Sequence, residues 1–173
     1  MKKIILPLLL LFISTNAYSQ RYDFRRNELK FNLITAIAGL PEFNYERLLD
    51  DNMGIGTAVA FSLEKPENMS LRGYVMPYCR MYFGERRASG FFLEANLALI
   101  NESESFTNYF IGSSQDPTSH VNYAVRGGFG TAVGFKIAKS NVVGELYLGV
   151  GRVFGNSFID AYPRIGITIG RRF

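Results

Sequence analysis

The sequence contains very little of several residue types, and each shortage excludes a class of structure or partner. Its 173 residues include one cysteine, one histidine and no tryptophan. A single cysteine, Cys79, cannot build an intramolecular disulfide framework. The basic residues form no run, and without Lys2 and Lys3 the 19 basic residues fall to 17 against 15 acidic residues. This charge balance gives no reason to expect nucleic acid as a partner.

Long apolar runs are also scarce. Residues 4–13 form an apolar run that is interrupted only by Pro7, and this is about half of the ~20 residues that a membrane-spanning helix needs. The run follows a basic start and precedes a small-x-small site at residues 17–19, which is the pattern of a secretory signal peptide. We therefore expect a cleaved signal peptide over residues 1–19 and one domain over residues 20–173. No later apolar stretch is long enough for a helical span.

The pattern that is present is an alternation of apolar with polar or small residues. It is clearest over residues 162–173, where Ile165, Ile167 and Ile169 alternate with Arg164, Gly166, Thr168 and Gly170. A period of two residues is typical of a β-strand with one apolar face. The same pattern predicts eight strands, over residues 28–38, 42–49, 53–63, 71–83, 91–100, 121–137, 142–153 and 162–173. We expect the last strand to close a barrel by pairing with the first.

The lengths of the connections between these strands indicate the topology of the barrel. Those after the second, fourth and sixth strands are short, and those after the third, fifth and seventh are longer, with residues 39–41 after the first strand as an exception. Alternating short and long connections are typical of an up-and-down barrel with two different ends. The sequence therefore predicts an all-β fold, an eight-stranded antiparallel up-and-down transmembrane β-barrel, with both termini at the short-connection end.

A soluble eight-stranded barrel also alternates, so the direction of the apolar face has to be argued. The other face carries glycine, alanine, tyrosine and charged residues at mid-strand, namely Glu46, Arg80, Glu94, Arg126, Glu145 and Arg164. The lumen of eight strands is too narrow for the large apolar side chains of all strands together. If these side chains face lipid, the charges meet inside, where they avoid hydrocarbon. We expect an ion-pair network that plugs the lumen, with an ion or proton path as the alternative.

These features together resemble the small outer-membrane β-barrel families of Gram-negative bacteria, of the OmpA-barrel and OmpX kind. The resemblance covers the chain after residue 19 and includes a closing strand that ends at Phe173. It implies an outer-membrane location, contact with outer-membrane lipid and lipopolysaccharide, and recognition of the last strand by the barrel assembly machinery. Arg171 departs from the family's closing pattern, which favours an apolar or aromatic residue there. We expect a monomer.

The candidate chemistry of the sequence is sparse. Gly128-Phe129-Gly130 with Gly134 has a spacing similar to that of a phosphate loop, but it opens no helix, and small residues in a narrow lumen explain it better. Some barrels of this kind are lipid A-modifying enzymes with a histidine and a serine at the outer rim. His120 is preceded by Ser119, and Asp116 is near, but the order of the lipid A deacylase family is missing. We predict no catalytic, cofactor or metal site.

The long loop predicted over residues 101–120 holds Phe106, Tyr109 and Phe110. Exposed aromatic residues often mark a contact surface, although they also pack locally over a barrel mouth. Both interpretations stay open. The function that the sequence favours is a non-enzymatic outer-membrane barrel with a structural or surface-interaction role. The alternatives are a lipid A-modifying enzyme and a minimal pore.

Overall fold

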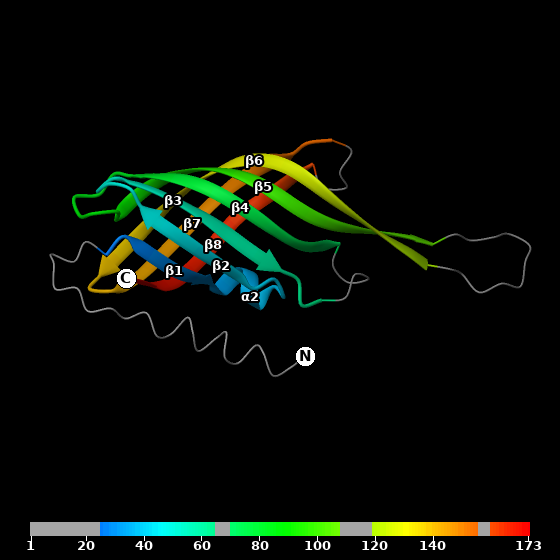
Figure 1. The fold of residues 1–173 in the computed structure, drawn as a ribbon, viewed down its shortest axis with the longest axis horizontal. Coiled ribbons are helices and arrows are strands. Elements are labelled where there is room, and N and C mark those ends of the chain that lie inside the picture. The colour runs from blue at the N-terminus through cyan, green and yellow to red at the C-terminus, as the bar shows by residue number, and fades with distance from the viewer. Residues whose placement is uncertain (1–24, 65–69, 108–118, 156–159) are drawn as a thin grey trace, which may run out of the picture.

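The computed structural model describes residues 25–64, 70–107, 119–155 and 160–173, and the side chains of residues 104–107 and 119–122 are not included in the description. Within these residues eight strands form one closed antiparallel barrel, in sequence order, with β1 paired to β8 (Figure 1). The strands are β1 Asn27–Asn32, β2 Glu42–Leu48, β3 Met53–Phe61, β4 Leu71–Tyr82, β5 Gly90–Thr107, β6 Ser119–Lys139, β7 Val142–Val153 and β8 Ala161–Arg172. The predicted eight-stranded antiparallel barrel is confirmed.

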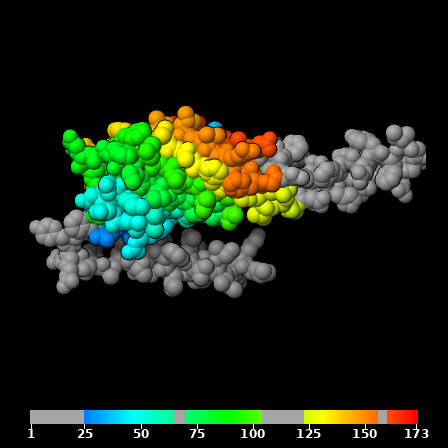
Figure 2. Space-filling view, turned by 90° about the horizontal axis from the view of Figure 1, so that it is seen from above, coloured from blue at the N-terminus to red at the C-terminus, as the bar shows by residue number. Residues whose placement is uncertain are grey.

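The barrel closes between its first and last strands, as the alternation of residues 162–173 predicted. Asn27 and Phe173 exchange both backbone hydrogen bonds, at 3.0 and 2.7 Å. The pairing continues from Glu28 opposite Arg172 to Asn32 opposite Thr168. In the space-filling view the strands form a continuous wall along the length of the barrel (Figure 2).

The first strand is shorter than predicted. The expected strand over residues 28–38 ends at Asn32, and a short helix, α2 (Leu33–Ile37), follows. The Asn32 side chain caps the helix by accepting a hydrogen bond from the Ile34 N–H. Gly39, with φ of +80°, ends it in a conformation that glycine adopts easily. Residues 33–38 are apolar at both odd and even positions, so they lack the alternation that distinguishes the two faces of a strand.

Because β1 ends at Asn32, the connection between β1 and β2 is longer than the predicted residues 39–41 and is no longer an exception among the connections. The first connection spans residues 33–41, and it lies at the end of the barrel where β3, β5 and β7 end and β4, β6 and β8 begin. The opposite end has the connections over residues 49–52, 83–89 and 140–141. The two ends therefore differ consistently, and α2 belongs to the end with the longer connections (Figure 1).

The loop predicted over residues 101–120 is also wrong in extent. β5 continues to Thr107 and β6 begins at Ser119, so that their pairing extends to Thr107 opposite Ser119. This hairpin reaches beyond the rest of the barrel (Figure 1). Its polar composition suggested a loop, but a hydrogen-bonded ladder depends on the backbone, and strand preference is strongly dependent on context.

The interior contains two apolar clusters, and buried charged residues pack against both of them. One consists of Ala58, Met76, Tyr78, Ala98, Ile100, Val153 and Tyr162. The other consists of Leu48, Tyr82, Ala88, Phe92 and Tyr147. Ala88 lies in the short β4–β5 connection and is fully buried, so this connection folds under the barrel and covers that end. No helix among the described residues is both long and apolar enough to cross a membrane.

Candidate functional site: the lumen network and the outer groove

Ten charged side chains meet inside the barrel, and we call this set the lumen network. It has five acidic and five basic members: Glu28, Glu42, Glu46, Glu94 and Glu145 with Lys30, Arg80, Lys136, Arg164 and Arg172. Every strand except β3 supplies at least one of them. The charges balance, and nine of the ten side chains are at most 2% exposed.

The centre of the lumen network is the contact between Arg80 and three carboxylates. The Arg80 guanidinium lies 2.7 Å from Glu94, 2.9 Å from Glu145 and 3.1 Å from Glu46. Lys30 pairs with Glu145 at 2.6 Å and also with Glu46. Glu46 and Glu145 each accept from both cations, so neither carboxylate is buried without a partner.

The lumen network extends from this centre toward both ends of the barrel. On the side of α2, Arg164 donates to Glu94 at 3.0 Å and to Glu42 at 2.9 Å. On the side of the short connections, Lys136 lies 2.6 Å from Glu28, which also pairs with Arg172 at 2.7 Å. The ion pairs therefore form one continuous path along the lumen rather than isolated pairs.

Tyrosine and phenylalanine rings enclose the cations of the lumen network. The Arg80 guanidinium carbon lies 4.4 Å from the ring centre of Tyr78 and 4.5 Å from that of Phe92. Arg164 lies 4.7 Å from the ring centre of Tyr147, whose hydroxyl donates to Glu42. The hydroxyls of Tyr74 and Tyr82 donate to Glu42 and Glu46 respectively. Cation–π contacts of this kind are strongest when the cation is desolvated.

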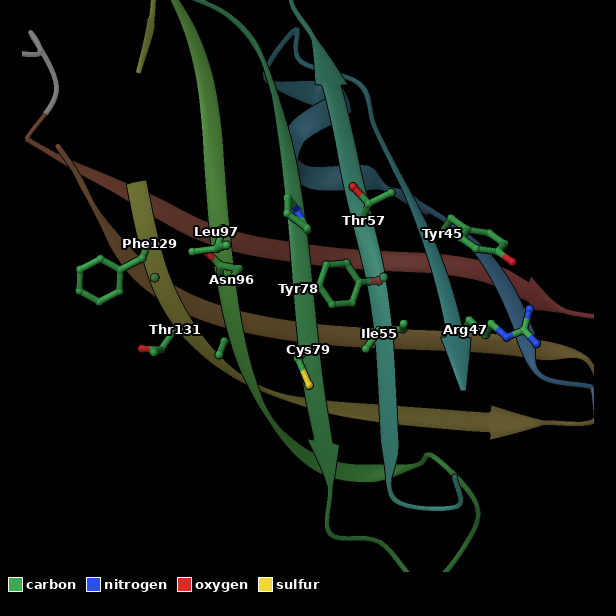
Figure 3. Close-up of a pocket in the computed structure, with 14 residues that line it drawn as sticks. Tyr45, Arg47, Ile55, Thr57, Tyr78, Cys79, Asn96, Leu97, Phe129 and Thr131 are labelled. Atoms are coloured by element: carbon green, nitrogen blue, oxygen red, sulfur yellow. The ribbon is translucent and has the colours of Figure 1, made fainter. Parts of the chain in front are cut away.

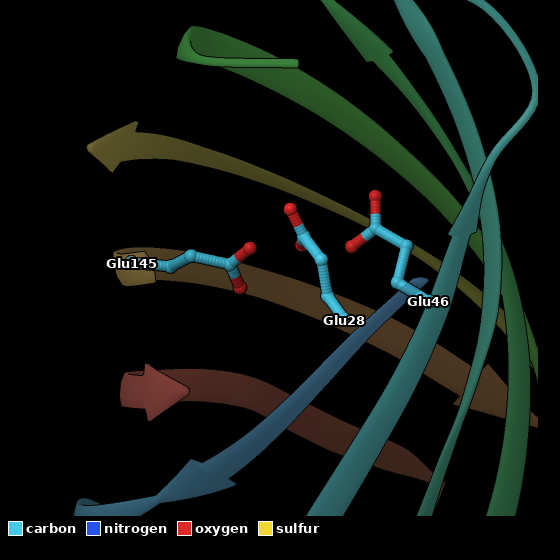
Figure 4. Close-up of side chains that lie close together, drawn as sticks. All are labelled: Glu28, Glu46 and Glu145. Carbon is cyan, nitrogen blue, oxygen red and sulfur yellow. The ribbon is translucent and has the colours of Figure 1, made fainter. Parts of the chain in front are cut away.

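Glu28, Glu46 and Glu145 bring carboxylate oxygens within 4.8 Å of one another, close enough to consider a metal ion (Figure 4). Two ammonium groups already lie among them. Lys30 contacts all three, and Lys136 lies 2.6, 3.6 and 3.4 Å from Glu28, Glu46 and Glu145. The lysines supply the positive charge that a metal ion would bring, so the arrangement fits an ion-pair cluster better than a metal site.

Five of the six charges singled out from the sequence belong to the lumen network, namely Glu46, Arg80, Glu94, Glu145 and Arg164. Arg126 does not. It lies farther along β6, opposite Ile100, and is only partly buried. Sequence reasoning overlooked Glu28, Lys30, Glu42, Lys136 and Arg172 as members. Their positions in the strand alternation placed them on the inner face, so a stricter use of that alternation would have found them.

The aromatic residues proposed as a surface contact lie mostly outside the described part. Phe106 belongs to β5, where its backbone pairs with that of His120, but neither side chain is described. Tyr109 and Phe110 lie outside the described residues, as does Asp116.

A groove on the outer surface is a second candidate site (Figure 3). It has a volume of about 700 Å³ and crosses β2 to β6. Its lining combines small side chains, among them Thr57, Pro77, Ala95 and Thr131, with larger ones such as Leu97. The lining is mostly apolar and carries the exposed charge of Arg47 at one side. The groove is thus a hollow in the outer apolar surface, although the buried Tyr78 and Asn96 also line it.

Comparison with solved structures finds a similar fold. The N-terminal β-barrel domain of OprF from Pseudomonas aeruginosa matches with a TM-score of 0.53 and 13% sequence identity, over 86% of this chain and 98% of that one. At this identity the likeness establishes the fold only. No family model matches the chain, and no match was found among curated proteins.

Proposed function

We propose that this protein is a non-enzymatic outer-membrane β-barrel of a Gram-negative bacterium, with a structural or surface-interaction role. The observation that carries the proposal is the orientation of the barrel wall. On β8, Ile165, Ile167 and Ile169 face outward and are 38–53% exposed, whereas Arg164 and Thr168 face inward and are each 2% exposed. The other strands show the same arrangement, with Leu97, Val133 and Leu148 among the exposed apolar side chains.

This arrangement is the reverse of that of a water-soluble barrel. Monomeric soluble proteins rarely expose contiguous apolar patches larger than a few hundred Å², and here the apolar surface surrounds the wall. In hydrocarbon the same surface is favourable, and because β1 pairs with β8 the barrel leaves no whole strand edge without hydrogen bonds there. The fold shared with the OprF barrel domain agrees with a membrane location.

We further propose that the lumen network serves as a plug. Its charges are mutually paired, and rings of both apolar clusters, Tyr78 and Phe92 among them, pack directly against Arg80 at its centre. An ion would have to break several close ion pairs to pass. This supports a structural barrel over the alternative of a minimal pore.

The proposed partners are outer-membrane lipid and lipopolysaccharide on the outer wall, and the barrel assembly machinery through the strand that ends at Phe173. Support comes from the exposed Ile167, Ile169 and Phe173 on and after β8. We propose that the folded barrel is a monomer, because its sheet closes on itself and leaves no complete edge strand for another copy.

A membrane-fraction gel tests the proposal. Cells that express the full chain are fractionated, and the outer-membrane fraction is run with and without boiling. We expect the protein in this fraction, with different mobility before and after boiling, because a folded barrel resists the detergent until heated. A protein that folds and stays monomeric in buffer without detergent would refute the membrane location. Unchanged lipid A masses in cells with and without the protein would support the absence of enzymatic activity.

A further inference from the structure

The barrel wall has a seam where β1 ends early. β1 pairs with β8 only as far as Asn32 opposite Thr168, whereas β8 extends back to Ala161. Because Asn27 and Phe173 form a hydrogen-bonded pair, the alternation of an antiparallel ladder directs the backbone groups of Pro163 and Ile165 toward this seam.

The seam is adapted to the missing strand. Pro163 has no N–H group to leave unpaired, which is why proline is tolerated at strand edges. The Ile165 carbonyl accepts a hydrogen bond of 3.1 Å from the Asn32 side chain. Helix α2 packs against β8 where β1 would otherwise have continued. A short helix, rather than a strand, therefore covers this part of the wall.

A cavity of about 230 Å³ lies behind the seam. Its lining includes Ile34 and Ala38 from α2 and its C-cap, and the buried Met76 and Ile100 from inside the barrel. It also includes Pro163 and Ile165, which alternate to the outer face and are exposed. The cavity thus runs from interior residues to residues of the outer wall, and it is distinct from the groove across β2 to β6.

We propose that this cavity takes the end of a hydrocarbon chain of a bilayer lipid, which enters between α2 and β8. The inference rests on the membrane location proposed above. The lining is almost wholly apolar, and the outer side of the seam is continuous with the apolar wall through Ile165 and Ile167. A chain of a neighbouring lipid can enter sideways while its headgroup stays outside.

The charges of the cavity favour a lipid chain over a free fatty acid. Arg164 is the charged residue in the lining, and its guanidinium already donates to Glu94, Glu42 and the Asn44 side chain. A free fatty acid that entered headfirst would bring a carboxylate with no uncommitted cation to meet it, and an unpaired buried charge is costly.

Photocrosslinking tests the proposal. The protein is reconstituted into vesicles of phosphatidylethanolamine and phosphatidylglycerol in which a fraction of the phosphatidylethanolamine carries a diazirine near the methyl end of one acyl chain. After illumination, mass spectrometry locates the labelled residues. We expect label on the outward Leu97 and Val133, and also on the buried Met76 or Ile100. Phe92, which is buried elsewhere in the lumen, should carry none.

A pair of variants on the α2 segment provides a matched comparison. Both residues are exposed, but Ala38 lines the cavity and Ile37 does not, so Ala38→Phe adds bulk at the cavity and Ile37→Phe adds it outside the lining. We expect Ala38→Phe to lower the label on Met76 and Ile100 about tenfold, the order of magnitude for overpacking a site. Ile37→Phe should leave it unchanged.

Several results would overturn the proposal. One is that, in the unmodified protein, the outward residues carry label and neither Met76 nor Ile100 does. This result would refute lipid entry into the cavity even if Ala38→Phe does not fold. A second is label on these two residues from a free diazirine fatty acid but not from the phospholipid. Absence of label from Leu97 and Val133 would instead refute the membrane location, and with it the entry of a lipid chain from the bilayer.

Discussion

At the scale of single residues, the lumen network matters because each carboxylate shares cations with others. A buried ion pair stabilises the folded protein little more than an apolar pair of the same size would. Removal of one partner, however, leaves an uncompensated buried charge, which is strongly destabilising. Arg80 contacts Glu46, Glu94 and Glu145, so its loss would affect three carboxylates at once. The contribution of the lumen network is therefore best measured by single substitutions at its centre.

The first prediction concerns this arginine. Arg80→Met keeps most of the side-chain volume and removes the charge, and we expect it to lower the free energy of unfolding by about 3–5 kcal/mol. Urea unfolding in lipid vesicles, followed by gel mobility, measures the change. Arg171→Met, at an exposed position on the same sheet, should change it by less than about 0.5 kcal/mol. Equal effects of the two substitutions would contradict the assigned role of Arg80.

The second prediction concerns a glycine that lies against an aromatic ring. A Cβ at Gly166 would lie 2.3 Å from the Tyr147 ring, and Tyr147 is held by hydrogen bonds with Asn32 and Glu42. We expect Gly166→Ala to cost about 1–3 kcal/mol of stability, as overpacking does. At Gly127 a Cβ would meet nothing within 4 Å, so Gly127→Ala should be neutral or raise stability by up to about 1 kcal/mol. Melting temperatures of both variants decide this.

At the scale of the strand, the distinguishing property is that each ribbon has a charged or small inner face and an apolar outer face. Val133 lies within β6, opposite Leu93 on β5 and Leu148 at the middle of β7, and all three are exposed. Ile137 lies on the same face of β6 but near its turn to β7. The proposed membrane location assigns these two positions different depths in the bilayer.

The third prediction uses this difference in depth. Val133→Arg should cost about 2–4 kcal/mol, the cost of arginine at the bilayer midplane, whereas Ile137→Arg should cost about 0–1 kcal/mol, as it does near an interface. The yield of folded, heat-modifiable protein in the membrane fraction measures both. Similar yields for the two variants would argue against hydrocarbon on the outer wall.

The helix between β1 and β2 shows how one element changes the surrounding wall. Residues 33–38 could have extended β1 and paired with the part of β8 before Thr168. They instead form α2. The Asn32 side chain caps the start of this helix, and Gly39, with its positive φ, ends it, and both features favour a helix. The seam and its cavity are consequences of that choice.

At the scale of the whole molecule, the proposed plug consists of the lumen network and the two apolar clusters. Glu94 and Glu145 contact different parts of the lumen network, the first with Arg80 and Arg164 and the second with Arg80, Lys30 and Lys136. Neutralising both leaves the cations in excess without removing the side chains from the lumen. Stability should therefore fall while the lumen stays filled.

The fourth prediction follows from this. We expect the double variant Glu94→Gln, Glu145→Gln to have a lower melting temperature than the unmodified protein, and neither protein to show steady single-channel conductance in planar bilayers. Glu85→Gln, in the exposed β4–β5 connection, serves as the control for loss of one acidic charge. A rise in conductance with unchanged melting temperature would argue for a pore and against the plug.

Much of this architecture is readable from the sequence because it depends on local alternation. Ile165, Ile167 and Ile169 are separated by single residues, and a strand places such residues on one face whatever it pairs with. The number of strands, their faces and the closing strand all follow from that rule. Five members of the lumen network were also predicted, because mid-strand charges among small residues have to lie on the inner face.

The tertiary structure alone decided which of those residues meet. Lys30 and Glu145 are 115 positions apart in the sequence, and their contact depends on barrel closure and strand register, which act across the whole chain. The same holds for Arg126, which shares the inner face but lies at another height. The contact of α2 with β8, which is more than 120 positions away in the sequence, is likewise visible only in the tertiary structure. Alternation is a property of neighbours in sequence, whereas register and closure are properties of all eight strands together.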